Sequence, residues 1–180
     1  MTDFSDMLRP DAVQTGVIAK NKKAVFQHLA ALVTEWIADD SNRAGSDTGD
    51  LKPTGPETAD PTIADPRIIV DLLSAREKLG STGFGGGVAI PHAKLEGLTQ
   101  VVGAFVRLAQ PIDFQAVDDL PVDLVFMLLS PPNAGAVHLK ALARVSRRLR
   151  DEAFLQKLRG AGSPDALYAL FTADEVRDAA

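Results

Sequence analysis

The 180-residue sequence contains no cysteine. The protein therefore has no disulfide, no thiolate metal ligand, no iron–sulfur cluster and no cysteine nucleophile. Long apolar runs are also missing, because stretches such as Leu124 to Leu129 are far too short to span a bilayer. The start, MTDFSDMLRPDAV, lacks the apolar region of a secretory signal. We expect a cytoplasmic protein with no direct membrane insertion.

Positive charge is also in deficit relative to negative charge. Nineteen Lys and Arg against 24 Asp and Glu give a formal net charge of −5. No basic run offers the electrostatic footprint that nucleic acid requires, so we expect no nucleic-acid partner. The composition, 46% hydrophobic and 24% charged, is that of a folded globular protein. A chain of this length predicts one domain over residues 1–180.

Hydrophobic periodicity predicts two helices in the first half of the chain. The first spans 22–38, where Asn21 can cap the N-terminus. Its apolar residues at helical spacing are Val25, Leu29, Leu32 and Trp36. The second begins at Pro66, preceded by Asp65 as the cap, and ends at Gly80.

The segment between these helices, 41–62, has a different composition. Gly, Pro, Ser and Thr make up 12 of its 22 residues, and Leu51 is its only large apolar side chain. Such a segment buries too little surface to offset the entropy lost on ordering. We expect a mobile surface insertion within a single domain.

Strand patterns follow the second helix. VAI, VVGAFVRL and VDLVFMLL are short, partly β-branched apolar runs, and AVQTGVIA near the N-terminus has weaker strand character. Between the last two runs, 110–121 is expected to be a loop with room for a short edge strand. Helical spacing returns from Ala136, and shorter helices are predicted near 152–158 and after Ser163. The apolar face of the helix from Ala136 comprises Leu139, Leu142, Val145 and Leu149. This order predicts an α/β fold with a mixed parallel and antiparallel sheet flanked by helices on both faces.

The three histidines stand in different settings. His28 lies at the border of the first helix's apolar face and is expected to be an ordinary surface residue. His92 ends STGFGGGVAIPHAK, where four glycines run into a strand and a proline. A Gly-rich turn lets backbone N–H groups converge on an anion, and functional groups of open α/β sheets gather at strand ends. A plain glycine hairpin with a turn histidine is the alternative interpretation, which spacing alone favours.

His138 stands at the start of the amphipathic helix, directly after the third run. If both strands end at one edge of the sheet, His92 and His138 face one another. Two imidazoles are too few for a catalytic metal site, and the GxGxxG and Gly-Lys nucleotide motifs are absent. The pair therefore favours a phosphoryl relay with no metal or other cofactor, because neutral imidazole is a good nucleophile near pH 7. Local packing of His138 is the alternative.

Neighbouring polar residues have two interpretations each. The planar guanidinium of Arg76 suits phosphate oxygens, but an exposed ion pair is the usual role of a helical arginine. The other candidates for a phosphate-binding loop are Ser81, Thr82, Gly87 and Lys94. Each of these also fits an ordinary role in a turn or at a solvated surface.

Three stretches together resemble a known family: REKLGSTGFGGGVAIPHAKLEGL, VVGAFVRLAQPIDFQAVDDLPVDLVFMLLSP and VHLKALARVSRRLRDEAFLQKL. They are similar to the type 2 IIA domain, the mannitol and fructose class, of the bacterial phosphoenolpyruvate phosphotransferase system (PTS). More narrowly they resemble its nitrogen-regulatory IIA branch. The resemblance runs from about Met7 to Phe171, the insertion excepted, and implies the same single α/β domain.

The resemblance also implies a chemistry for the site. His92 would receive a phosphoryl group on Nε2 from an HPr-like, histidine-phosphorylated carrier protein. His138 would position and stabilise that group, and Arg76 would steady the phosphate. A phosphotransferase component of this kind would regulate partners such as sensor kinases or potassium transporters through its phosphorylation state. A IIA component of a fructose- or mannitol-type permease, or a binding module that is never phosphorylated, are the alternatives.

Two departures from the family pattern stand out. The 41–62 segment is longer than the usual connection. Family members commonly have Ile where Phe84 stands and Gly where Ala93 stands. Phe84, flanked by glycines, is expected to be an exposed aromatic at a docking surface near the active site.

Overall fold

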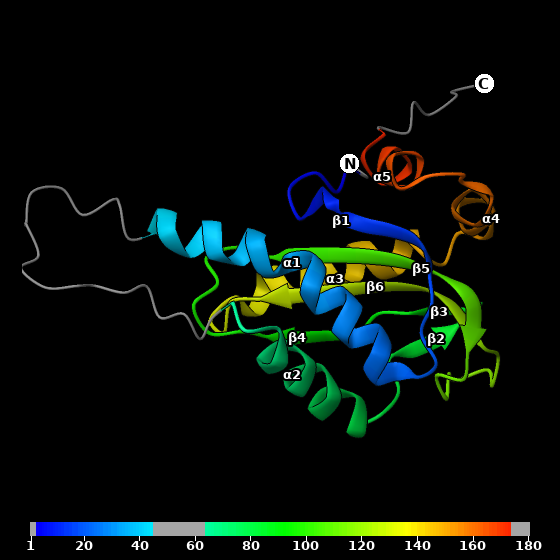
Figure 1. Cartoon of the computed structure of the whole chain (residues 1–180), viewed down its shortest axis with the longest axis horizontal. Helices are drawn as coiled ribbons and strands as arrows, with labels where there is room; N and C mark the ends of the chain where they lie inside the picture. Colours follow the sequence, from blue (N-terminus) through cyan, green and yellow to red (C-terminus); the bar gives the residue numbers. More distant parts are fainter. Residues whose placement is uncertain (1–2, 45–63, 174–180) are drawn as a thin grey trace, which may run out of the picture.

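The computed structural model describes residues 3–44 and 64–173 of the chain (Figure 1). In chain order the elements are β1 (Leu8–Val17), α1 (Lys22–Ala44), α2 (Pro66–Lys78), β2 (Gly83–Gly85), β3 (Val88–Ala89), β4 (His92–Lys94), β5 (Val102–Ile112), β6 (Val122–Ser130), α3 (Gly135–Arg148), α4 (Glu152–Gly160) and α5 (Pro164–Thr172). The predicted insertion lies outside the described residues from residue 45 onward.

One mixed sheet organises the fold. Its strand order is β1-β5-β6-β3-β2, and β4 also pairs with β6. β5 and β6 are antiparallel, whereas β1 is parallel to β5 and both β3 and β4 are parallel to β6. β3 and β4 follow one another along the same edge of β6, with Val88 opposite Leu124 and His92 opposite Leu128. The mixed sheet predicted from the sequence is confirmed.

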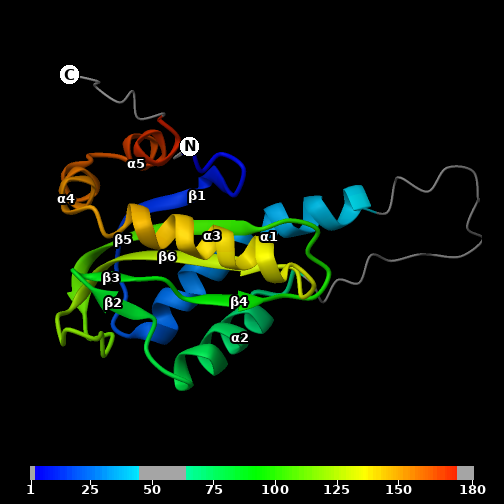
Figure 2. The ribbon, with the colours of Figure 1, turned by 180° about the vertical axis from the view of Figure 1, so that it is seen from behind.

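Helices cover both faces of this sheet. α1 and α2 lie on the face seen in Figure 1, and α3 lies on the reverse face seen in Figure 2. α1 packs on β1 and β5, α2 on β4, and α3 on β6. The predicted arrangement of helices on both faces is confirmed.

Aromatic packing attaches α5 to the sheet. The ring centroid of Phe171 lies 4.9 Å from that of Phe105, 5.5 Å from Phe126 and 5.4 Å from Phe154. All three rings meet Phe171 edge-on, the geometry in which the positive edge of one ring faces the negative face of another. The last helix is therefore part of the main core.

α1 begins where the sequence predicts but ends later. Asn21 Oδ1 accepts a hydrogen bond from the N–H of Ala24 at 2.9 Å, which confirms the cap. The helix continues to Ala44, beyond the predicted end at residue 38, so the first residues of the 41–62 segment are helical. The buried carboxylate of Asp40 accepts hydrogen bonds from Thr99 Oγ1 at 2.6 Å and Gln100 Nε2 at 2.7 Å. These long-range contacts hold the added turn in place.

The sheet also has strands that the sequence pattern did not indicate. β5 continues to Ile112, into the segment expected to be a loop. The short strands β2 and β4 occupy the glycine-rich and His92 segments, where propensity for strand is poor. Their pairing with β3 and β6 provides backbone partners that local sequence cannot reveal.

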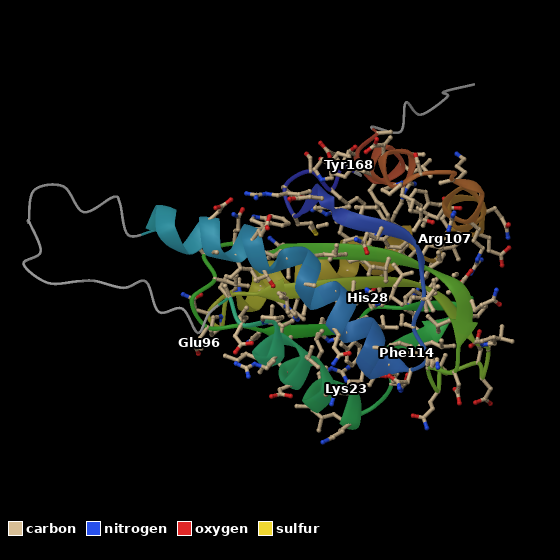
Figure 3. All side chains as sticks on the ribbon, in the orientation of Figure 1. Lys23, His28, Glu96, Arg107, Phe114 and Tyr168 are labelled. Atoms are coloured by element: carbon tan, nitrogen blue, oxygen red, sulfur yellow. The ribbon has the colours of Figure 1, made fainter. Side chains whose placement is uncertain are left out.

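Arg107 joins the end of α4 to β5 (Figure 3). Its Nη1 donates hydrogen bonds to the carbonyls of Leu158, Arg159 and Ala161 at 2.7, 2.9 and 2.7 Å. Carbonyls at a helix end have no partners within the helix, so this cation satisfies them and also favours the negative end of the helix dipole.

We predict that Arg107→Met lowers the free energy of unfolding by about 2 kcal/mol, because the variant keeps the apolar stem but loses hydrogen bonds from a charged donor. Urea denaturation followed by circular dichroism measures the loss. Arg67→Met is the matched control, since the Arg67 side chain is 87% exposed and its ion pair with Asp65 lies at the surface. Equal stability of the two variants would contradict the assigned role.

Candidate functional site

His92 and His138 meet at one edge of the sheet. β4 runs parallel to β6, so the two strands end at the same edge, and α3 places His138 in its first turn just after β6. The two imidazole ring centroids lie 5.7 Å apart. The structure thus brings together the two histidines that the sequence predicts to face one another. His28, by contrast, is exposed on α1, as expected (Figure 3).

Backbone contacts fix the orientation of the His92 ring. Nδ1 lies 2.8 Å from the carbonyl oxygen of Ile90, and a carbonyl only accepts, so Nδ1 carries the proton. Nε2 then holds a lone pair and accepts a hydrogen bond from Arg76 Nε at 3.3 Å. Arg76 Nη1 also donates to the carbonyl of Gly80 at 2.9 Å, which orients the guanidinium. The nucleophilic nitrogen of His92 is therefore Nε2.

Burial lowers the pKa of both imidazoles. Burial lowers the pKa of His92, and the charge of Arg76 lowers it further, while the Ile90 hydrogen bond and Glu77 act in the opposite direction. Burial also lowers the pKa of His138, with smaller contributions from His92 and Lys94. Since an ordinary histidine titrates near 6.5, both imidazoles are neutral at pH 7.

An open pocket of 450 Å³ joins these groups. Its polar lining comprises Arg76, His92, Lys94 and His138, and its apolar lining comprises Leu72, Ala75, Leu79 and Ala93. Lys94 is exposed at the end of β4. Two cations and two neutral imidazoles around one open pocket form a site suited to a small anion.

The structure does not bring the other loop candidates to this pocket. Ser81 Oγ donates to the carbonyl of Phe114 at 2.7 Å, and Thr82 Oγ1 donates to Glu77 at 2.6 Å, so both hydroxyls hold the turn after α2. Gly87 lies opposite the start of β6, where its carbonyl accepts from the N–H groups of residues 123 and 124. The intervening β3 separates it from His92, and Gly87 does not line the pocket of the two histidines.

Gly87 has a structural role of its own. Its φ of +78° favours glycine, and an added Cβ would lie 2.6 Å from Arg159 Nη2 and 2.9 Å from Asp123 Oδ1. Those two side chains form an ion pair at 2.7 Å. The glycine therefore makes room for a contact between α4 and β6 at the opposite end of β6 from His92.

Two side-chain contacts at the site were not predicted from the sequence. The carboxylate of Glu77, only 7% exposed, pairs with Lys22 Nζ at 2.9 Å and accepts from Thr82, which anchors the end of α2 beside Arg76. Ser130, at the end of β6, is fully buried, and its Oγ lies 2.7 Å from His138 Nδ1. The position of Glu77 next to Arg76 in the sequence could have indicated that Glu77 lies near the site. A single serine at the end of a strand gives no such indication for Ser130.

Two predictions about the surface are wrong. Phe84 is half-buried, and the guanidinium carbon of Arg150 lies 5.7 Å from its ring centroid. Because Arg150 follows the C-terminus of α3 and His138 is in the first turn of α3, Phe84 lies near the opposite end of that helix from His138. Leu139 was expected on the apolar face of the helix, but its side chain is 65% exposed. Val137, two residues earlier, is 57% exposed. Helical spacing placed Leu139 on the apolar face, but α3 is buried only from its second turn onward. The buried residues of this face are Ala141, Val145 and Leu149.

Among residues 3–44 and 64–173, no group of three or more His, Cys, Asp or Glu side chains could hold a metal ion. No helix within these ranges is both long and apolar enough to cross a membrane.

Comparison with known proteins identifies the class to which this fold and site belong. Residues 57–174 match the family described as phosphoenolpyruvate-dependent sugar phosphotransferase system, EIIA 2. The nitrogen regulatory protein of Pseudomonas aeruginosa is 44% identical over 170 residues, covering 94% of this chain and 95% of the relative. That of Bradyrhizobium diazoefficiens is 40% identical over 167 residues, covering 93% of each.

Solved structures agree with these relatives. The crystal structure of nitrogen regulatory protein IIA-Ntr from Neisseria meningitidis matches with a TM-score of 0.72 and 31% identity, over 92% of this chain and 97% of that one. The chain therefore belongs to the EIIA 2 family of the PTS. Its relatives place it in the nitrogen-regulatory IIA branch of that family, which confirms the resemblance seen in the sequence.

We predict that His92 and His138 both titrate below the ordinary histidine pKa of about 6.5. Imidazole chemical shifts followed by NMR from pH 8 to pH 4 measure the two values. Arg76→Gln should raise the pKa of His92, because removing the nearby cation makes the charged imidazole less unfavourable. Lys94→Gln is the control, since Lys94 acts on His138. A lower His92 pKa in Arg76→Gln would contradict the assignment.

Proposed function

We propose that this protein is a phosphohistidine carrier of a nitrogen-regulatory PTS, with Nε2 of His92 as the acceptor. The observation that carries the proposal is the hydrogen bond from His92 Nδ1 to Ile90, which leaves Nε2 unprotonated, with its lone pair directed at Arg76 in a pocket with two cations. The donor would be an HPr-like protein phosphorylated on histidine, in keeping with the family of this chain.

The transfer balances without a cofactor. The Nε2 lone pair of His92 forms the new N–P bond while the N–P bond of the donor breaks, and that electron pair returns to the donor's imidazole. The His92 ring then carries both Nδ1–H and the phosphoryl group. The carbonyl of Ile90, which accepts from Nδ1 at 2.8 Å, stabilises the positive charge that the ring acquires.

The neighbouring side chains fit an incoming phosphoryl group. Arg76 already donates toward Nε2, so its guanidinium is placed beside the atom that would bear the phosphorus. Lys94 adds a second cation at the end of β4, the strand that begins with His92. His138 faces His92 across the pocket. These groups offset the charge of the phosphoryl oxygens where they would lie.

Regulation would follow from the change of charge at this surface. Leu79 is 85% exposed at the rim of the pocket, and the exposed Val137 and Leu139 flank His138. A phosphoryl group adds about −1.5 to −2 charges at pH 7. A partner that docks on an apolar surface would therefore distinguish the two forms. We propose that regulatory targets such as sensor kinases or potassium transporters recognise this difference.

We predict that His92→Ala abolishes phosphorylation by phosphoenolpyruvate, the first PTS enzyme and the histidine carrier. Intact-mass spectrometry should show one acid-labile phosphoryl group on the wild type and none on the variant. His138→Ala should still accept the group but retain it less well. His28→Ala, an exposed histidine on α1, should behave as the wild type. Persistent labelling of His92→Ala would place the acceptor elsewhere.

A further assay separates the regulator from a sugar permease component. The phosphorylated chain is mixed with a fructose- or mannitol-specific IIB protein, and the label is followed. We expect the phosphoryl group to stay on His92. Rapid transfer to the IIB protein would favour the permease function instead.

A further inference from the structure

We propose that Ser130 is a positioning residue whose hydroxyl fixes the Nε2–H tautomer of His138, so that His138 presents an N–H to the phosphoryl group on His92. The functional consequence rests on the proposed function, in which His92 accepts the group. The tautomer itself is a property of the unphosphorylated protein and is measured without transfer.

The sheet holds Ser130 in a defined place. It is the last residue of β6 and lies opposite Lys94 of β4, and its carbonyl accepts from the N–H of Leu95 at 2.9 Å. Its side chain is fully buried. His138 is tied to the same region, because its N–H bonds to the carbonyl of Ala134 in the turn that follows β6. The 2.7 Å contact between Ser130 Oγ and His138 Nδ1 thus joins two fixed backbones.

The available partners determine which atom donates in the hydrogen bond between Ser130 Oγ and His138 Nδ1. If Nδ1 carried the proton, Oγ would accept it, and the hydroxyl proton would need another acceptor. Within the described part of the chain, His138 Nδ1 is the hydrogen-bond partner that Oγ has. A buried O–H without an acceptor is costly, whereas an unused lone pair on a hydroxyl costs little. The hydroxyl therefore donates to Nδ1, and the proton of the neutral ring resides on Nε2.

The two imidazoles then hold complementary tautomers. His92 keeps its proton on Nδ1, bonded to Ile90, and offers a lone pair at Nε2. His138 keeps its proton on Nε2, on the ring edge away from the buried serine, and lines the same pocket. A phosphoryl group on His92 has only acceptor oxygens. The Nε2–H of His138 attracts them, whereas the opposite tautomer would turn a lone pair toward an anion.

The first test measures the tautomer directly. Ser130→Thr and Ser130→Val have nearly the same shape and differ in the hydroxyl, and Ser130→Ala is a smaller hydroxyl-free variant if Val does not fold. Long-range ¹H–¹⁵N spectra of histidine-labelled protein at pH 8 identify the protonated nitrogen of His138. We expect Nε2–H in the wild type and Thr variant, with a hydrogen-bonded Nδ1 shift. In the hydroxyl-free variant we expect that Nδ1 shift to be lost and the Nδ1–H population to rise. Nδ1–H in the wild type, or unchanged spectra without the hydroxyl, would overturn the proposal.

The second test asks whether Ser130 acts through His138. The lifetime of the phosphoryl group on His92 is measured for the wild type, Ser130→Thr, Ser130→Val and His138→Ala, and for Ser130→Val combined with His138→Ala. We expect the Val variant to lose roughly 10-fold in lifetime, the effect of one hydrogen bond to a charged group, and the Thr variant to retain it. In the His138→Ala background the Val substitution should have no further effect.

An equal loss from Ser130→Val in the His138→Ala background would show a merely structural role and overturn the proposal. Failure of the wild type to accept a phosphoryl group would instead refute the proposed function. In that case the spectra of the unphosphorylated protein would still decide the tautomer.

Discussion

The parallel pairing of β4 with β6 is the constraint on which the site depends. It sets His92 opposite Leu128 and Lys94 opposite Ser130, so that β4 supplies an imidazole and a cation while the end of β6 supplies Ser130 and leads into α3. A slip of one residue in this register would turn the His92 side chain to the other face of the sheet. Backbone hydrogen bonds hold the register on either side of His92, from the N–H of Leu128 to the carbonyl of Pro91 at 3.0 Å and from the N–H of Leu95 to the carbonyl of Ser130 at 2.9 Å. The pairing that completes the sheet therefore also sets the geometry of the site.

The cations of the site act in both states of the proposed cycle. In the unphosphorylated protein, burial and the charge of Arg76 lower the pKa of His92 and keep its lone pair available. The same guanidinium, anchored by Gly80 and by the end of α2 through Glu77, would attract a phosphoryl dianion to that nitrogen. Once the dianion is bound, it offsets the cations and makes protonation of the neighbouring rings less unfavourable. Burial is the largest cause of the lowered pKa of His92, and the charge of Arg76 adds to it while also favouring the anion of the proposed cycle.

Much of the architecture was predictable because its signals are local. Asp65 and Pro66 mark the start of α2, the three apolar runs became β3, β5 and β6, and the His92 and His138 motifs identified the family. The rest depends on contacts between distant segments. The extension of α1 rests on Asp40 meeting residues 99 and 100, and β4 exists because β6 is beside it. The role proposed for Ser130 depends on its contact with His138, eight residues further along the chain. No sequence pattern predicts that a serine at a strand end contacts such a histidine.

The site has a division between interior and surface. Ser130 and the carbonyl of Ile90 are buried and act on the two imidazoles from behind, so their influence is confined to protonation and orientation. Leu79 is exposed at the rim of the pocket, and the exposed Val137 and Leu139 precede and follow His138 in α3. Single exposed apolar side chains are common on folded proteins, but apolar residues gathered beside a functional site are typical of a surface that binds a partner. The interior groups are therefore suited to control the chemistry of His92, whereas the apolar rim is suited to report the state of His92 to a partner.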